Sequence, residues 1–206
     1  MLQLHPTRPR TERGAAKPWA IALIVIVVLI VILGFSSVGA YNNMVRMREQ
    51  IHQTWSEVDV NIQRRADLIP NLVNTVKGFA KQEQTVIGEV TSARAALGGA
   101  RTPTERMAAN NQLDGALSRL LVVVENYPQL RSNQNFLALQ DELTGTENRI
   151  AVSRRQYNLA IQTYDAYIST FPNNIVAHLS GMAYNNEYFQ TSPANRAAPP
   201  TVSFPQ

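Results

Sequence analysis

The stretch Trp19–Ala40, WAIALIVIVVLIVILGFSSVGA, decides how the rest of this chain is organised. Trp19–Phe35 contains no charged or strongly polar side chain, and the run to Ala40 adds only two serines and small or apolar residues. At a rise of ~1.5 Å per residue, a helix of about 22 residues is ~33 Å long and crosses a hydrocarbon core of ~30 Å. The sequence therefore predicts a transmembrane helix over residues 19–40, followed by a domain held at the membrane.

Residues 1–18 form a basic tail rich in Pro, Arg and Thr, a composition typical of disorder. A cleaved signal peptide is the alternative to an anchor, with Val38-Gly39-Ala40 as its small-residue cleavage site. The apolar run is longer than an ordinary signal core, however, and Trp19 suits a position at the membrane interface. A retained single-pass anchor is the favoured interpretation.

The basic residues around this stretch are distributed unevenly. Four of the 19 Lys and Arg residues precede it, whereas Arg46 and Arg48 are the only ones in the first 20 residues after it. Because Lys and Arg concentrate on the cytoplasmic side of a membrane helix, this asymmetry favours a cytoplasmic N-terminus and an external domain. Arg64 and Arg65 lie a little further on and weaken the asymmetry.

Composition excludes several classes of function. The chain has no cysteine, which excludes disulfides, thiolate metal sites and a lipidated cysteine. After the apolar stretch, 15 Lys and Arg stand against 14 Asp and Glu, so the domain is nearly neutral. We therefore expect no nucleic-acid partner.

Residues 41–172 are predicted to form an antiparallel, up-down bundle of four long helices, so the fold class is all-α. Apolar residues recur at helical spacing in four segments. They are Ile51, Trp55, Val58 and Ile62; Leu72, Val76, Val86, Val90 and Leu97; Leu113, Leu117, Leu120 and Val124; and Phe136, Leu143, Ile150, Tyr157, Tyr164 and Phe171. Since no Gly or Pro lies between Tyr41 and Ile69, the membrane helix is expected to run directly into the first segment.

The ends of these helices are marked by particular residues. Pro70 is expected to separate the first two, because proline lacks an N–H and clashes with the preceding turn. The alternative is one kinked helix of ~57 residues, which would leave part of its apolar stripe facing water. Thr102-Pro103-Thr104-Glu105 has the residues of a capping box at the start of the third helix, and Asn133 is the expected N-cap of the fourth.

The fourth helix is longer than the others by ~11–14 residues, so its end is expected to return towards the membrane. Residues 173–189 then predict a short amphipathic helix and a loop near the membrane interface, or alternatively a segment packed on the flank of the bundle. Residues 190–206, with four prolines, are expected to be a disordered C-terminal tail. The seven-residue spacing of the fourth helix is typical of a coiled coil and favours a homo-oligomer.

Three long motifs resemble the LemA family: Trp55–Glu83, Leu120–Asn158 and Thr163–Ala177. The ending PPTVSF, Pro199–Phe204, is also similar, and the resemblance covers roughly residues 38–204. It implies a bacterial cell-membrane protein with one N-terminal membrane helix, an antiparallel helical bundle and no defined biochemical activity. One member of the family is associated with magnetosome membrane formation, which implies a membrane-organising role. The basic extension over residues 1–18 departs from the family pattern.

No constellation of residues indicates catalysis or cofactor binding. His5, His52 and His178 are far apart in the sequence and have no metal-ligand spacing. The chain contains neither a phosphate-binding GxxxxGK[ST] motif nor a GxSxG nucleophile motif. We therefore predict no enzymatic activity, no cofactor and no metal.

One group of polar residues stands out against the apolar stripes. Its members are Asp59, Arg64, Arg65, Asp67, Glu147, Asn148 and Arg149. The favoured interpretation is an interhelical ion-pair network that fixes the register of the helices, and the alternative is a pocket or a docking surface for a partner.

Three functional hypotheses follow from these features. The first is a membrane-anchored, non-enzymatic scaffold that organises or shapes membrane lipid through self-association. The second is a membrane-tethered adaptor that binds an unidentified protein partner, such as a protease, a sensor or an envelope protein, through a face of the bundle. The third is a small enzyme with an unfamiliar site near Glu147.

Overall fold

The computed structural model describes residues 18–185 and 187–189, which form α-helices and no strand. The helices are α1 (Pro18–Phe79), α2 (Gln84–Gly99), α3 (Pro103–Val124), α4 (Pro128–Arg131), α5 (Gln134–Ser169) and α6 (Asn173–Leu179). The all-α prediction is confirmed. The sequence predicts tails over residues 1–18 and 190–206. Pro18 is instead the first residue of α1, and residues 1–17 and 190–206 lie outside the described residues.

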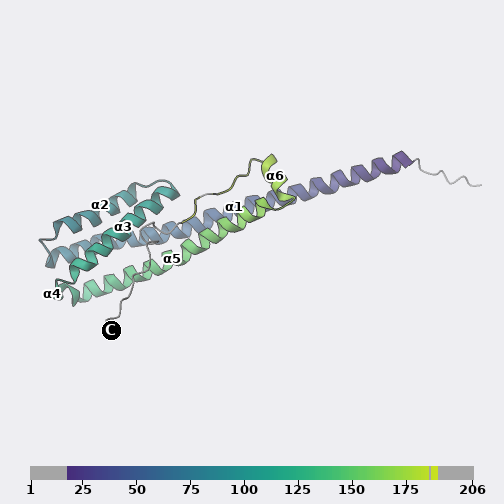
Figure 1. Cartoon of the computed structure of the whole chain (residues 1–206). Coiled ribbons are helices and arrows are strands. Elements are labelled where there is room, and N and C mark those ends of the chain that lie inside the picture. Colours follow the sequence, from purple (N-terminus) through teal and green to yellow (C-terminus); the bar gives the residue numbers. More distant parts are fainter. Residues whose placement is uncertain (1–17, 186, 190–206) are drawn as a thin grey trace, which may run out of the picture.

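Helix α1 contains the apolar stretch and continues without interruption into the folded domain (Figure 1). No side chain from Trp19 to Gly39 is buried, and from Trp19 onward Ala40 is the first buried residue. This half of α1 is long and apolar enough to cross a membrane. The predicted continuity between the membrane helix and the first helix of the domain is confirmed.

The predicted break at Pro70 is wrong, because α1 passes through Pro70 and ends only at Phe79. A proline at position 70 removes the N–H that would bond to the carbonyl of Ala66. In the structure, Arg94 Nε of α2 donates to that carbonyl at 3.0 Å. The lost backbone hydrogen bond is thus replaced by a tertiary one, and the turn moves to residues 80–83.

The longer α1 changes the proportions of the domain (Figure 1). Helix α5 runs antiparallel to α1 along most of the domain, and together they form a two-helix stalk. The hairpin of α2 and α3 packs only on the part of α1 farthest from the membrane helix. No Cα of α3 lies within 8 Å of a Cα of α5. The helices follow the predicted up-down order, but a closed bundle of four similar helices is not confirmed.

The predicted apolar stripes form most of the core. Ile51, Val58 and Ile62 of α1 are buried, as are Phe136, Ile150 and Tyr157 of α5. The predicted stripes of the second and third helices are also largely buried, including Leu72, Val76, Val90, Leu97, Leu113, Leu117 and Leu120. Phe171, the last member of the α5 pattern, lies beyond the helix and is exposed.

Both predicted N-caps are present. The Thr102 hydroxyl accepts from the Glu105 N–H at 3.2 Å, and the Glu105 carboxylate accepts from the Thr102 N–H at 3.2 Å. Hydrogen bonds from the backbone N–H groups of Arg101 and Thr102 lower the pKa of Glu105. The Asn133 side chain accepts from the Phe136 N–H at 3.1 Å and begins α5.

Candidate functional site

Arg65 lies at the point where α1, α3 and α5 approach one another. Its guanidinium contacts Asp114 of α3 and donates to Glu147 of α5 at 2.5 Å. The residue is only 7% exposed, so its charge is compensated mainly by these two carboxylates. Because no Cα of α3 lies within 8 Å of a Cα of α5, Arg65 bridges two helices that are not closely packed.

Asp114 also interacts with polar side chains of α3 and α5 other than Arg65 and Glu147. Asn110, one turn earlier in α3, donates to Asp114 at 3.1 Å, and an Arg154 nitrogen of α5 lies 3.9 Å from it. Burial raises the pKa of Asp114, an effect that Arg65 partly offsets and Glu147 reinforces. The site is therefore a charge cluster in which one arginine is shared by two carboxylates.

A second ion pair holds the α2–α3 hairpin against α1. Arg106 of α3 donates to Asp59 of α1 at 2.5 Å, and its other nitrogen donates to the Leu97 carbonyl at 3.2 Å. The Arg106 side chain is largely buried. Arg106 therefore links the end of α2, the start of α3 and the middle of α1.

The predicted polar residues separate into two groups in the structure. Asp59, Arg65 and Glu147 form ion pairs between helices, whereas Arg64, Asp67, Asn148 and Arg149 are exposed. Asp67 accepts a local hydrogen bond from Gln63 at 2.8 Å. The geometry therefore places Arg64, Asp67, Asn148 and Arg149 outside these ion pairs, and a docking role for them stays a prediction.

Sequence reasoning missed Asn110, Asp114, Arg106 and Arg154. A signal for two of them was available, because Asn110 and Asp114 fall on the same helical face as Leu113 and Leu117. Polar residues within an apolar stripe predict buried partners on another helix. Their partners could not be assigned without knowing which helices meet.

An open groove lies next to the charge cluster, between α3 and α5. It has a volume of about 210 Å³ and is lined by four leucines and by five polar residues, which are Arg65, Gln140, Thr144, Glu147 and Asn148. The leucines are Leu72, Leu117, Leu121 and Leu143. The separation of α3 and α5 leaves this apolar lining accessible from outside.

The segment after α6 packs on one face of the α1–α5 stalk. Phe189 packs against both Trp55 and Tyr157, whose own ring centroids are 5.4 Å apart, at centroid distances of 5.9 and 5.8 Å. The Arg154 guanidinium is 5.0 Å from the Phe189 ring centre. The backbone of Phe189 also exchanges two hydrogen bonds with the Asn158 side chain, at 2.9 and 3.0 Å. Burial raises the pKa of Tyr157 to about 12. Trp55 is thus a partly buried packing residue that this segment covers.

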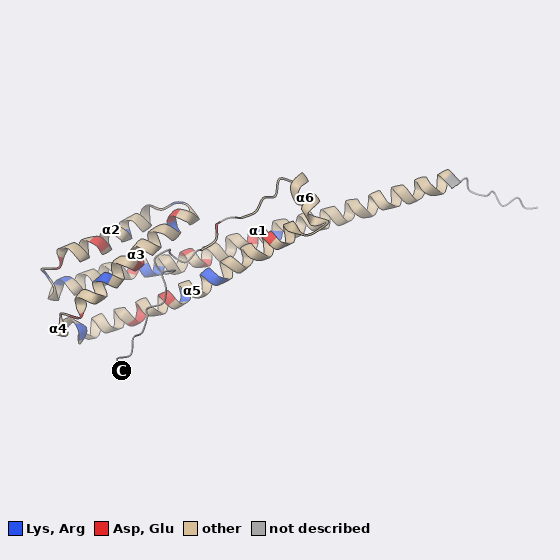
Figure 2. Cartoon of the chain, viewed as in Figure 1, with Lys and Arg blue, Asp and Glu red and all other residues tan. Residues whose placement is uncertain are grey.

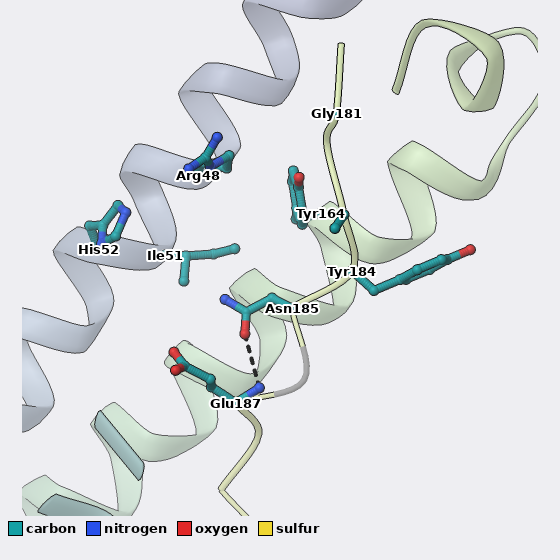
Figure 3. Close-up of a pocket in the computed structure, with 9 residues that line it drawn as sticks. Arg48, Ile51, His52, Tyr164, Gly181, Tyr184, Asn185 and Glu187 are labelled. Atoms are coloured by element: carbon teal, nitrogen blue, oxygen red, sulfur yellow. Dashed lines mark hydrogen bonds between the residues drawn. The ribbon is translucent and has the colours of Figure 1, made fainter. Parts of the chain in front are cut away.

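A cavity of about 420 Å³ opens between the stalk and this segment (Figure 3). Arg48, Ile51 and His52 come from α1, Tyr164 comes from α5, and Asn185 and Glu187 close the opposite side. Arg48 donates a hydrogen bond to the Met182 sulfur at 3.5 Å. Among the described residues, no group of three or more His, Asp or Glu side chains is placed to hold a metal ion.

Among residues 18–185 and 187–189, charged side chains are confined to the domain (Figure 2). They occur along the stalk and the α2–α3 hairpin, whereas the half of α1 beyond α6 has no Lys, Arg, Asp or Glu. The distribution separates a part of the molecule suited to lipid from a part suited to water.

Comparisons with known proteins identify the relatives of this chain. The model of the LemA family matches residues 54–204. Magnetosome protein MamQ 2 of Paramagnetospirillum magneticum is 30% identical over 94% of this chain and 80% of its own length. Magnetosome protein MamQ of Magnetospirillum gryphiswaldense is 25% identical with the same coverage. Protein LemA of Metamycoplasma hominis is 25% identical over 79% of this chain and 74% of its own length.

Proposed function

The chain belongs to the LemA family, and we propose that it is a non-enzymatic, single-pass membrane protein whose helical domain is a rigid scaffold that organises membrane through self-association. One observation carries the proposal: α1 is a single helix from the apolar stretch into the core of the domain. Ala40 and Met44 are already buried in the first turns after that stretch. A domain attached in this way cannot rotate freely about its anchor, unlike one on a flexible linker.

The relatives support a role at a membrane. Two of them are named as magnetosome proteins, and none of the three names describes an enzyme. Together with the apolar half of α1, the family indicates a membrane location. A membrane scaffold accounts for both this location and the stiff connection through α1.

The stalk offers a face for contact between copies. Residues 181–185 and 187–189 cover one side of α1 and α5, and on another side a groove of about 410 Å³ is open. Its lining contains Thr54, Leu159, Ala160 and Thr163 and only one charged residue, Glu57. Copies inserted in the same direction in one membrane would present this face at the same height, which favours lateral association.

The test breaks the stiffness while keeping both the anchor and the domain. A flexible Gly-Ser segment is inserted between Ala40 and Tyr41 of the full chain, and the matched control inserts the same number of residues as a helical, Ala-rich segment. In supported bilayers, the number of copies per cluster is counted by single-molecule photobleaching. We expect the flexible insertion to reduce clustering and the helical insertion of whole turns to preserve it. Equal behaviour of the two insertions contradicts the rigid-scaffold proposal.

The contact face has its own test. Because the chain has no cysteine, Leu159→Cys gives a single site for a short bifunctional thiol cross-linker in the membrane-embedded protein. Leu137→Cys, an exposed position on the distal part of α5, is the control. Dimers through Leu159 and not through Leu137 are expected, and the reverse pattern excludes this face.

The adaptor hypothesis is favoured by one observation, the leucine-lined groove between α3 and α5. Leu121 lines it, whereas its neighbour Val122 is more exposed and does not. If a protein partner binds there, Leu121→Arg abolishes its cross-linking to the full chain and Val122→Arg does not. If neither variant abolishes the cross-linking, the partner does not bind in the groove.

For orientation we propose a cytoplasmic N-terminus and an external domain, on the charge asymmetry of the sequence. Protease added outside intact cells is then expected to cleave a tag at the C-terminus and to leave an N-terminal tag uncut. Cleavage of the N-terminal tag alone reverses the orientation.

A further inference from the structure

Helix α6 and the loop before it carry apolar side chains that the domain leaves uncovered. Phe171 is 79% exposed, Ile175 is 50% exposed and Leu179 is 81% exposed. Ile175 and Leu179 are one turn apart and share a face of α6, while Ala177 on another face is buried. The segment is therefore attached to the domain by one face and presents another that has no protein partner among the described residues.

Helix α6 lies at the end of the domain where the membrane helix emerges (Figure 1). Asn43 of α1 donates to the Tyr167 hydroxyl at 3.2 Å, and Asn173 at the start of α6 donates to the Tyr167 carbonyl at 3.4 Å. These contacts fix the start of α6 near Asn43. Figure 1 shows the bare half of α1 continuing away from this point.

The level of the membrane surface can be estimated from α1 itself. Trp19 and Tyr41 are exposed aromatic residues at the two ends of the apolar run, the positions at which such rings mark the two interfaces. Their separation along a helix is ~33 Å, close to the ~30 Å hydrocarbon thickness. Asn43 lies ~3 Å further along the helix, within a headgroup layer that is ~5–8 Å thick.

The charge pattern of the segment agrees with this level. Between Asp165 and Glu187 the chain contains no Lys, Arg, Asp or Glu. Burying the apolar face in lipid therefore requires no Lys, Arg, Asp or Glu side chain to lose its water. Farther from the membrane, Tyr188 and the Asn185 N–H contact Asp165 at 2.9 and 3.0 Å, so the rest of the segment packs on the stalk.

Resting on the proposed membrane anchoring, we infer that Phe171, Ile175 and Leu179 insert into the lipid interface beside α1 and form a second membrane contact of the same chain. The domain then meets the bilayer at two places, and rotation about the axis of α1 is restricted. An amphipathic element of this kind binds lipid through its buried apolar area.

Single-cysteine labelling of the full chain in nanodiscs tests the inference. Leu179→Cys, Val122→Cys and Ile30→Cys are each labelled with an environment-sensitive fluorophore. Val122 is an exposed apolar residue of α3 on the distal hairpin, and Ile30 lies within the membrane helix. At Leu179 we expect a blue-shifted emission and loss of intensity with nitroxide-bearing lipids. The Val122 label should show neither change.

The measurement compares nanodiscs that contain one copy of the chain with nanodiscs that contain several copies. A label at Leu179 that aqueous iodide quenches as strongly as the label at Val122 overturns the inference. A label at Leu179 that is protected only in discs with several copies also overturns it, because a second chain then covers this face. Loss of lipid quenching at Ile30 would instead refute the membrane anchor, so the two failures are distinguishable. Far-UV circular dichroism checks that each variant keeps its helices.

Discussion

Replacement of Arg65 by methionine gives the most direct test of the charge cluster. The substitution keeps an unbranched apolar stem and removes the cation that Asp114 and Glu147 share. Removing one partner of a fully buried ion pair typically costs about 3–5 kcal/mol. The Asp114 and Glu147 side chains are 31% and 43% exposed, so water compensates part of the loss. We expect Arg65→Met to lower the free energy of unfolding of the domain by about 2–4 kcal/mol at neutral pH.

The loss of stability caused by Arg65→Met should become smaller as the pH falls. Burial already raises the pKa of Asp114, and Arg65 is the nearest group that opposes the rise. Without Arg65, the pKa of Asp114 in the folded state rises further above its value in the unfolded state. The contribution of Asp114 to stability is then fully present below the unfolded pKa and is lost as the pH rises through the folded pKa. The difference between variant and wild type should therefore be largest near neutral pH and shrink towards about pH 4.

Urea unfolding of the full chain in detergent micelles, followed by far-UV circular dichroism, measures this difference through the midpoint of the transition. The membrane helix stays helical in the micelle, so the transition reports on the domain. Arg64→Met is the matched control, since Arg64 is exposed and should change stability by less than about 0.5 kcal/mol. If Arg65→Met and Arg64→Met behave alike, the cluster has no stabilising role. If Arg65→Met instead causes the same loss at neutral pH and near about pH 4, the loss does not arise from the ionisation of Asp114.

Three further predictions use the same unfolding measurement. Arg94→Met should lower the free energy of unfolding by about 1–3 kcal/mol in the wild type. In a Pro70→Ala background, which restores the missing backbone N–H, the same substitution should cost less than about 1 kcal/mol. Equal losses in both backgrounds would show that Arg94 does not compensate for the proline. Thr102→Ala should cost about 1 kcal/mol because it removes the N-cap of α3, while Thr104→Ala should be nearly neutral. Phe136→Ala should cost about 3–5 kcal/mol because the ring is fully buried at the start of α5, and a loss below about 1 kcal/mol would argue against that packing.

Local signals in the sequence were sufficient to predict the membrane helix, the apolar stripes and the two N-caps. Each of them depends on residues within one or two helical turns, such as Thr102 with Glu105 or Asn133 with Phe136. The position of the first turn could not be predicted in this way. Pro70 stays inside α1 because Arg94, 24 positions later, supplies the hydrogen bond that proline lacks. The actual turn over residues 80–83 contains neither Gly nor Pro.

The polar site was only partly predictable for the same reason. Arg65 and Glu147 are conspicuous as charges near apolar stripes, and their pairing requires α1 and α5 to run side by side. Asp114 has the same pattern in α3, but its partner became evident only once the α2–α3 hairpin was placed beside α1. Arg64 and Arg65 are adjacent and chemically identical, and only the rotation of α1 decides which of them is buried.

The unbroken α1 makes the molecule a lever whose short arm lies in the bilayer. Residues 41–79 extend ~58 Å beyond the apolar stretch at ~1.5 Å per residue. Transmembrane helices tilt to match the thickness of the surrounding hydrocarbon, and a change of ~10° in the tilt of α1 would move its far end sideways by ~10 Å. Small differences in bilayer thickness are thereby converted into displacements of the α2–α3 hairpin that are comparable to the diameter of a helix.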